Sequence, residues 1–187
     1  MAAKQDARIH YTYADYLEFD DSVRCELING DIYLLSPPVT SHRRILSRLF
    51  LKLGGFLGEK TGEIFTAPFA LRLFPKQDLS DDTVLQPDII VVLDSAKIKG
   101  RSCIAAPDMI VEILSPLTEH IDRTVKLKFY QEAGVREYWL ADPAAKSVQV
   151  CILENNSYTV SRYGASDTVA VNTLPGCAID MESIFDN

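Results

Sequence analysis

The apolar positions in the N-terminal third of the chain predict a β-hairpin between two helices. Two short apolar runs, residues 25–28 and 31–36, flank Asn29-Gly30, which is the strongest short signal for a hairpin. Upstream, Thr12 with Asp15 three residues later has the form of a capping box and predicts a short first helix. After Pro37-Pro38, apolar residues recur at helical spacing and predict a helix over residues 41–58, namely Ile45, Leu46, Leu49, Phe50 and Leu53.

The rest of the chain predicts mainly strands, with one further long helix. That helix covers about residues 120–133 and stops at Gly134. A second hairpin is predicted around Asn155-Asn156, and the tail ends in a short helical turn. Extended apolar segments occupy residues 63–74, 88–93, 109–115, 137–142, 147–153 and 158–163. Strands and helices mix without strict βαβ alternation, which predicts an α/β or α+β fold with a mixed sheet.

Composition narrows the class of protein. A chain of 187 residues favours a single domain over residues 1–187, and 47% hydrophobic with 24% charged residues is typical of globular proteins. No apolar run approaches the roughly 20 residues of a membrane span, and residues 1–13 lack the apolar core of a signal peptide. We therefore expect a cytoplasmic protein that does not contact membranes. The four cysteines form no CxxC pair, which gives no support to a zinc ribbon or thioredoxin-type chemistry.

Glu112 stands inside an apolar run, PDMIVEILSP at residues 107–116, where an ionised carboxylate needs a cation or hydrogen bonds. Asp108 lies four residues earlier on the same predicted strand, roughly 13 Å away at about 3.3 Å per residue, which is too far to share one ion. Asp88 begins a similar run, PDIIVV, on a different strand, so pairing of the two strands would bring it within coordinating distance. Two adjacent carboxylates repel each other unless a divalent cation or a proton relieves them.

Asp88 in PDIIVV, followed by Glu112 in VEIL, resembles the PD-(D/E)xK nuclease superfamily, and in particular its Uma-type family of restriction-endonuclease-like proteins. The matching segments span nearly the whole chain in the family's order: CELINGDIYLLSPP with His42 following, QPDIIVV, APDMIVEILSP, DRTVKLKFYQEAGVREYWLADP and LPG. The resemblance implies a restriction-endonuclease-like core, with a mixed sheet flanked by helices and an N-terminal β-hairpin. It also implies a phosphodiesterase site in which Asp88, Glu112 and the main-chain carbonyl of Ile113 bind a divalent metal.

The chain departs from the superfamily pattern at the lysine two residues after the second acid, where Leu114 stands. Either the site is inactive or another cation reaches it. The inward stripe of the following helix is predicted from its apolar residues Val125, Phe129 and Ala133. Lys126 lies at the border of that stripe, whereas Lys128 lies further round toward solvent. Because Lys126 also matches the family's KxxxY pattern before GVREYW, we predict it as the migrated lysine, supported by Tyr130.

Glu26 and His42 also match the family pattern, which implies a metal ligand and a supporting or substrate contact, respectively. From the residues alone each has a structural alternative: Glu26 as an outward-facing hairpin residue, and His42 as a hydrogen-bonded histidine at a helix boundary. Asp88, Glu112 and Lys126 also have a structural alternative, in which they form an ion-pair cluster at the edge of the core. A buried pair adds little net stability over apolar residues, which favours a functional role for the group.

With this resemblance, the sequence predicts a nuclease that uses Mg²⁺, or Mn²⁺, to hydrolyse phosphodiester bonds in DNA, with RNA as the alternative substrate. Duplex cleavage needs two sites, so we expect a homodimer. Lys97, Lys99 and Arg101, in the loop between the two acid-bearing strands, are predicted to contact phosphates if that loop stands beside the metal. The alternative is a catalytically inactive dimer with a binding or regulatory role, and the net charge of −7, which repels a polyanion, favours it.

Overall fold

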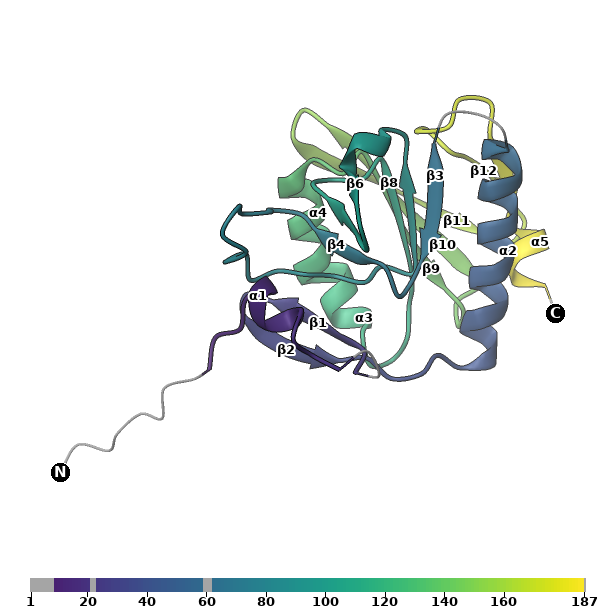
Figure 1. The fold of residues 1–187 in the computed structure, drawn as a ribbon. Helices are drawn as coiled ribbons and strands as arrows, with labels where there is room; N and C mark the ends of the chain where they lie inside the picture. Colours follow the sequence, from purple (N-terminus) through teal and green to yellow (C-terminus); the bar gives the residue numbers. More distant parts are fainter. Residues whose placement is uncertain (1–8, 21–22, 59–61, 187) are drawn as a thin grey trace.

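A six-stranded mixed sheet forms the centre of the protein in the computed structural model, which describes residues 9–20, 23–58 and 62–186 (Figure 1). Its strand order is β11-β10-β9-β8-β5-β3, and only β8 and β9 pair in parallel. The strands are β3 (Glu63–Thr66), β5 (Ile89–Val92), β8 (Met109–Ile113), β9 (Glu137–Asp142), β10 (Ser147–Glu154) and β11 (Ser157–Gly164). Such a sheet follows from β-branched, apolar runs separated by turn residues.

One face of the sheet is covered by helix α2 (Thr40–Leu57) and by the C-terminal elements (Figure 1). The helix buries a stripe at helical spacing, which consists of Ile45, Leu49, Leu53 and Leu57. This stripe packs in one cluster with Ile89 and Val91 of β5 and Val111 of β8. The C-terminal elements that share the cluster are β12 (Thr168–Ala170), β13 (Ala178–Asp180) and α5 (Glu182–Phe185).

The opposite face is covered by the second long helix, the N-terminal hairpin and a small sheet. The helix consists of α3 (Glu119–Ile121), a π-helical turn η2 (Asp122–Lys126) and α4 (Leu127–Ala133). The hairpin is β1 (Cys25–Ile28) with β2 (Asp31–Leu34), preceded by α1 (Tyr13–Tyr16). The small sheet has the order β4-β7-β6, from β4 (Ala70–Arg72), β7 (Ser102–Ile104) and β6 (Ile98–Lys99), and the turn η1 (Ser95–Lys97) precedes β6.

The alternation of side chains along β8 decides which way Glu112 points. Val111 and Ile113 belong to the cluster under α2, whereas Ile110 and Leu114 belong to the cluster under α4. Because side chains of a strand alternate between faces, Glu112 faces the second long helix. The pleat therefore places this carboxylate toward the helix that carries Lys126.

The predicted fold class, a mixed sheet flanked by helices with an N-terminal hairpin, is confirmed. Two details differ from the sequence prediction. Residues 63–74 divide into β3 and β4, which join two different sheets, and the helix predicted over 120–133 contains a π-helical turn. Among the described residues, no helix combines the length and the apolar character that crossing a bilayer requires.

Candidate active site

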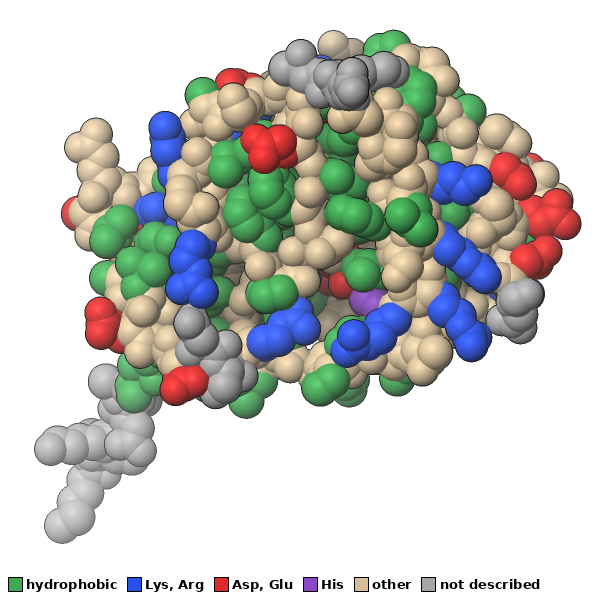
Figure 2. Space-filling view, turned by 45° about the vertical axis from the view of Figure 1, so that its right-hand side comes forward, with side chains coloured by type: hydrophobic (Ala, Val, Ile, Leu, Met, Phe, Trp, Pro, Cys, Tyr) green, Lys and Arg blue, Asp and Glu red, His purple; other side chains and the backbone are tan. Residues whose placement is uncertain are grey.

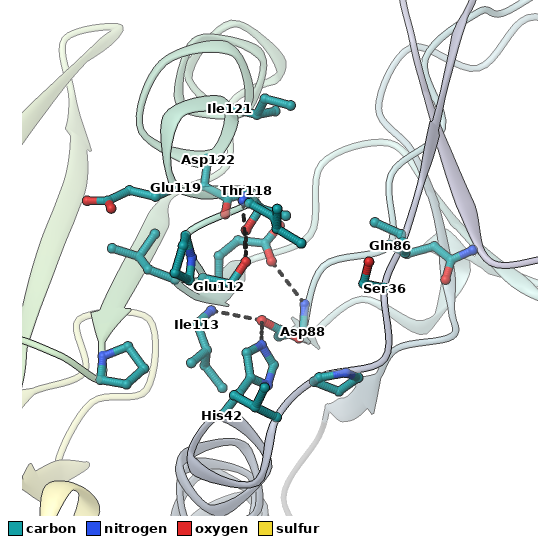
Figure 3. Close-up of a pocket in the computed structure, with 18 of the residues that line it drawn as sticks. Ser36, His42, Gln86, Asp88, Glu112, Ile113, Thr118, Glu119, Ile121 and Asp122 are labelled. Atoms are coloured by element: carbon teal, nitrogen blue, oxygen red, sulfur yellow. Dashed lines mark hydrogen bonds and ion pairs between the residues drawn. The ribbon is translucent and has the colours of Figure 1, made fainter.

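The antiparallel pairing of β5 with β8 brings Asp88 and Glu112 together. Ile89 lies opposite Val111, so Asp88 and Glu112 stand at the same end of the paired strands. The backbone amide of Asp88 donates to Glu112 Oε2 at 3.3 Å, and the amide of Ile113 donates to Asp88 Oδ2 at 2.8 Å (Figure 3). The sequence prediction that these two carboxylates are neighbours is confirmed in its geometry.

Ile113 also presents its carbonyl group on this side of β8. The N–H and C=O of one strand residue point to the same side, and the N–H of Ile113 points toward Asp88. If the register of Ile89 with Val111 is continued, Pro87 lies opposite Ile113. Because proline has no N–H, it cannot pair with the Ile113 carbonyl. The carbonyl oxygen therefore lies beside the two carboxylates without a ladder partner from Pro87.

Lys126 reaches the carboxylates from the helix on the same face. Its Nζ lies 2.9 Å from Glu112 Oε1, 2.9 Å from Glu26 Oε1 and 3.2 Å from Asp122 Oδ1. Leu114, at the usual lysine position, is instead buried in the apolar cluster with Tyr130 and Leu140. Lys128 is exposed and pairs with Glu132 at 3.8 Å. The structure thus brings Lys126, and not Lys128, to the acids.

The buried face of this helix differs from the predicted one. Its centre is the polar stripe Asp122, Lys126 and Tyr130, whereas Val125, Phe129 and Ala133 are only partly buried beside it. A polar stripe at a spacing of four normally marks a solvent-facing side, which is why the sequence pattern favoured the apolar stripe. Here the acids of β1 and β8 supply its partners. The π-helical turn at 122–126 accommodates this arrangement, and such turns are frequent at functional sites.

Tyr130 and Glu26 complete the inner part of the site. The hydroxyl of Tyr130 donates to Glu112 Oε1 at 3.1 Å. Glu26, on β1, is 3% exposed and accepts from the backbone amide of Gln86 at 2.8 Å in addition to its contact with Lys126. Glu26 therefore points inward, and its alternative as an outward-facing hairpin residue is wrong.

His42, in the first turn of α2, contacts Asp88 from the other side (Figure 3). Its Nε2 lies 3.0 Å from Asp88 Oδ2, and its Nδ1 has no hydrogen-bond partner among the described residues. Asp88 is thus oriented by two groups, the imidazole and the amide of Ile113. A side chain held in this way is positioned before any ligand arrives.

Negative charge exceeds positive charge inside the cluster, which holds one ammonium group, that of Lys126, and four carboxylates, those of Glu26, Asp88, Glu112 and Asp122. Burial, followed by the neighbouring carboxylates, raises the pKa of Glu112 well above its usual range, although Lys126 opposes the shift. Burial likewise raises the pKa of Asp122. Burial disfavours the ammonium form of Lys126, but the carboxylates outweigh it and hold the lysine pKa well above its usual range. The lysine is therefore charged, and the acids share protons or need a cation.

Asp88, Glu112 and the Ile113 carbonyl could contribute oxygen ligands to a divalent cation that also binds water and substrate oxygens. Among the described residues no three His, Cys, Asp or Glu side chains are grouped so that they could hold a metal ion. Magnesium seldom uses an all-protein cage: it takes one or two carboxylates, and water and substrate oxygens complete its octahedron. Asp88, Glu112 and the Ile113 carbonyl would supply that partial set. Asp122, which the sequence prediction missed, could have been found from its spacing of four with Lys126.

The loop with Lys97, Lys99 and Arg101 does not stand beside these carboxylates. It connects the end of β5 to the start of β8, whereas Asp88 precedes β5 and Glu112 lies near the end of β8. In an antiparallel pair the connecting loop and the two free ends are at opposite ends of the ladder. The prediction that this loop lies next to the site is therefore wrong, and Lys97 donates to the Ala106 carbonyl at 2.8 Å instead.

The carboxylates form the floor of a pocket of about 690 Å³. One wall comes from β2, the segment to Val39 and the start of α2, and the other from the loop after β8, α3 and the turn after β9. The lining includes all the residues of the cluster except Tyr130: Glu26, His42, Asp88, Glu112, Ile113, Asp122 and Lys126.

A mixed sheet that places two acids at the ends of paired strands, with a lysine from the adjacent helix, defines a restriction-endonuclease-like protein. The model of the Uma2 family, described as "Putative restriction endonuclease", matches residues 12–182, and the chain belongs to this family. Families of this kind typically use divalent metal ions.

One curated protein and one solved structure are similar to the chain over most of its length. The chain is 25% identical over 177 residues to the uncharacterised protein slr1290 of Synechocystis, which covers 91% of this chain and 89% of the relative. Its fold is similar to the crystal structure of a protein from Anabaena variabilis described as a "putative nuclease", with a TM-score of 0.78 and 19% identity over 94% of this chain and 97% of that one. At that identity the likeness shows the fold.

Proposed function

We propose that the protein is a Mg²⁺-dependent nuclease that hydrolyses phosphodiester bonds in DNA. The observation that supports this most is the contact of Lys126 with Glu112 at the paired ends of β5 and β8, next to Asp88. These are the acid, acid and lysine of the superfamily pattern, with the lysine supplied by the following helix in place of Leu114. Mn²⁺ fits the same oxygen ligands.

The metal, bound by Asp88, Glu112 and the Ile113 carbonyl, would polarise the phosphodiester and lower the pKa of an attacking water. Glu26 would add a direct or water-mediated ligand. Lys126 keeps its charge, so it orients the water or stabilises the charge that develops on the phosphate oxygens. Tyr130 donates to Glu112 and His42 contacts Asp88, so each carboxylate that would hold the metal has a fixed orientation.

The second candidate is a protein that keeps the fold but not the activity. It is favoured by the burial of Lys126 and Glu112, which are each 4% exposed and satisfy each other in the described state. A metal-dependent cleavage assay separates the two. Supercoiled plasmid and single-stranded DNA serve as substrates, each in Mg²⁺, in Mn²⁺ and in chelator. Absence of cleavage, together with no heat of Mg²⁺ binding in calorimetry, would favour the inactive protein.

We also propose a homodimer, formed through residues 63–74. Strand β3 is an edge of the six-stranded sheet, and Phe74 is 41% exposed at the end of the segment. The edge strand has unpaired backbone groups that can pair with a second copy, and Phe74, which follows β4 and lies against Phe129, is a separate exposed apolar side chain of the same segment. Light scattering at micromolar concentration, with Phe74→Ser as the interface variant, tests this: a wild-type monomer would exclude the dimer.

A further inference from the structure

The mouth of the pocket is unusually apolar for a site that binds a polyanion. Leu34 is 74% exposed, Val39 67% and Leu117 76%, and Tyr33 beside them is 38% exposed. They come from both walls, since Leu117 belongs to the loop after β8 and the others to β2 and the segment after it. Exposed leucines are ordinary when scattered singly. Four apolar side chains around one opening are a surface for an apolar part of a ligand.

In the part of the chain that the structure describes, residues that line the pocket carry four buried polar atoms without a hydrogen bond, and three of these have no ion pair either. Among the described residues, the buried side-chain atoms without a hydrogen bond are Arg24 Nε, His42 Nδ1, Gln86 Oε1 and Asp122 Oδ1, which is ion-paired with Lys126. All four residues line this pocket. An unsatisfied buried polar atom costs about 1–3 kcal/mol, so its presence calls for an explanation. A ligand that carries both donors and acceptors supplies one.

Helix α2 provides a basic surface that begins at the pocket. Its eighteen residues include no acid and four bases, Arg43, Arg44, Arg48 and Lys52. Ser41 and His42, in its first turn, line the pocket. Figure 2, which brings this side forward, shows Lys and Arg side chains beside a hollow with an acid and a histidine at its bottom. In a chain of net charge −7, this surface is a local site for phosphates.

An intact duplex does not suit this pocket. Glu26, Glu112 and Lys126 are 3–4% exposed, so the reacting phosphate must descend between the walls to reach them. Enzymes that react with a base act on single strands or turn the nucleotide out of the stack, because a stacked duplex cannot bring the base into a pocket. A phosphate that must reach the bottom of this pocket meets the same steric restriction. Single-strand binding combines a basic path for the backbone with apolar and aromatic surfaces for the bases. The mouth and helix α2 offer these two surfaces side by side.

We propose that the substrate is an unpaired nucleic-acid strand. One nucleotide enters the pocket, its base packs against Tyr33, Leu34 and Leu117, and the neighbouring phosphates follow Arg44 and Lys52 along α2. Arg24 and Gln86 provide hydrogen bonds inside. This inference rests on the proposed nuclease function and names its substrate class.

The first test is fluorescence anisotropy with three labelled oligonucleotides of one sequence: single-stranded DNA, single-stranded RNA and a blunt DNA duplex. Ca²⁺ replaces Mg²⁺ so that cleavage does not interfere. We expect the single strands to bind at least tenfold more tightly than the duplex, and the DNA and RNA arms identify which strand is preferred. Equal or tighter binding of the duplex would overturn the proposal.

The second test compares matched variants. Tyr33→Ala and the pair Leu34→Ala/Leu117→Ala should each weaken single-strand binding on the order of tenfold, because base stacking contributes about 1–3 kcal/mol. Val160→Ala, on β11, outside both the pocket and α2 and 48% exposed, is the control and should bind like the wild type. Since all these side chains are largely or partly exposed, the fold is expected to persist, which circular dichroism checks.

The phosphate path has its own control. Arg44→Ala/Lys52→Ala should make the binding constant less dependent on salt: the slope of log K against log salt concentration should fall by about 0.7 for each phosphate that is no longer neutralised. Lys99→Ala/Lys128→Ala, the control pair, should leave that slope unchanged.

Unchanged binding in both pocket and α2 variants would overturn the proposal even if the protein cuts DNA. Conversely, single-strand binding without any cleavage in Mg²⁺ or Mn²⁺ would remove the nuclease function and leave the substrate class standing. Absence of binding to every oligonucleotide would remove both.

Discussion

At the scale of single residues, the site depends on one ammonium group among several carboxylates. Lys126 contacts Glu26, Glu112 and Asp122, and each of the four side chains is almost completely buried. Buried ion pairs add little stability compared with apolar residues, so stability alone does not explain the cluster. Its excess of negative charge does suit a site that binds a metal ion.

The lysine variants test this assignment directly. We expect Lys126→Met to reduce cleavage by about 10²-fold or more, the effect of removing one charge-stabilising donor. Lys128→Met, with its exposed side chain, should stay within about twofold of the wild type. Steady-state cleavage of a labelled oligonucleotide measures both. Equal small effects would show that Lys126 takes no part in catalysis.

The raised pKa of Glu112 predicts a pH dependence of stability in the absence of metal. In the folded state Glu112 keeps its carboxyl proton at pH values above the ordinary pKa of 4.5. Between that pH and the folded pKa, the folded state therefore binds more protons than the unfolded state. The stabilising contribution is therefore complete below the ordinary value and is lost as pH rises through the folded pKa. In chelator, the melting temperature should therefore rise as the pH is lowered through the folded pKa toward the ordinary carboxyl value.

In Glu112→Gln, the melting temperature should depend less on pH than in the wild type. The gain in stability of this variant over the wild type should be largest at the higher pH. Thermal unfolding at several pH values, followed by circular dichroism, provides the measurement. The same slope in both proteins would mean that Glu112 is ionised in the folded state at neutral pH.

At the scale of elements, the position of Glu26 depends on how the N-terminal hairpin is attached. Leu27 on β1 pairs with Val84, and Leu71 on β4 pairs with Leu85, so residues 84–85 link the hairpin to the small sheet. The preceding loop is fixed by Arg72, which donates to both carboxylate oxygens of Asp81 at 2.6 and 2.8 Å. Its guanidinium also lies 3.9 Å from the centre of the Tyr13 ring.

Breaking that ion pair should loosen the hairpin. Arg72→Met is expected to cost about 3–5 kcal/mol at neutral pH, because Asp81 is left buried without its partner, while Arg72→Met/Asp81→Leu should cost much less. Burial opposes ionisation of Asp81, but Arg72 and a backbone amide outweigh it and lower its pKa. This stability is present above the ordinary value of 3.8 and is lost as pH falls through the folded pKa. Urea unfolding measures the free energy of unfolding of each variant. An equal loss of stability in the single and the double variant would contradict the role of the ion pair.

At the scale of the whole molecule, the charges are distributed unevenly. The net charge is −7, yet helix α2 carries four basic residues and no acidic ones. The acids of the site line the pocket at the N-terminal end of this helix. A divalent cation bound there would relieve the repulsion among the carboxylates. Metal binding should therefore stabilise the folded state as a whole.

We expect about 10 mM Mg²⁺ to raise the melting temperature by a few degrees at neutral pH, since a ligand at ten times its dissociation constant adds roughly 1.4 kcal/mol. Asp88→Asn should abolish the increase and keep the fold, because the amide oxygen can still accept from the Ile113 backbone. Differential scanning calorimetry with and without Mg²⁺ measures the melting temperatures of the wild type and of Asp88→Asn. An undiminished increase in Asp88→Asn would place the metal elsewhere.

The sequence by itself predicted most of the helices and strands and the residues of the candidate site. Asn29-Gly30, the helical spacing in residues 41–58 and the strand-like runs are local signals, and local signals predict local structure. Asp88, Glu112 and Lys126 were found from a family pattern, and the structure brings these residues together.

Only the tertiary structure decided what surrounds them. Because β5 and β8 pair antiparallel, Lys97, Lys99 and Arg101 lie at the far end of the ladder from the acids. Because the π-helical turn meets acids from β1 and β8, the polar stripe with Asp122 faces inward and not toward solvent. Arg24 and Leu117, far apart in the chain, line one pocket. Such relations depend on strand register and packing between distant segments, which no local pattern of apolar and polar positions encodes.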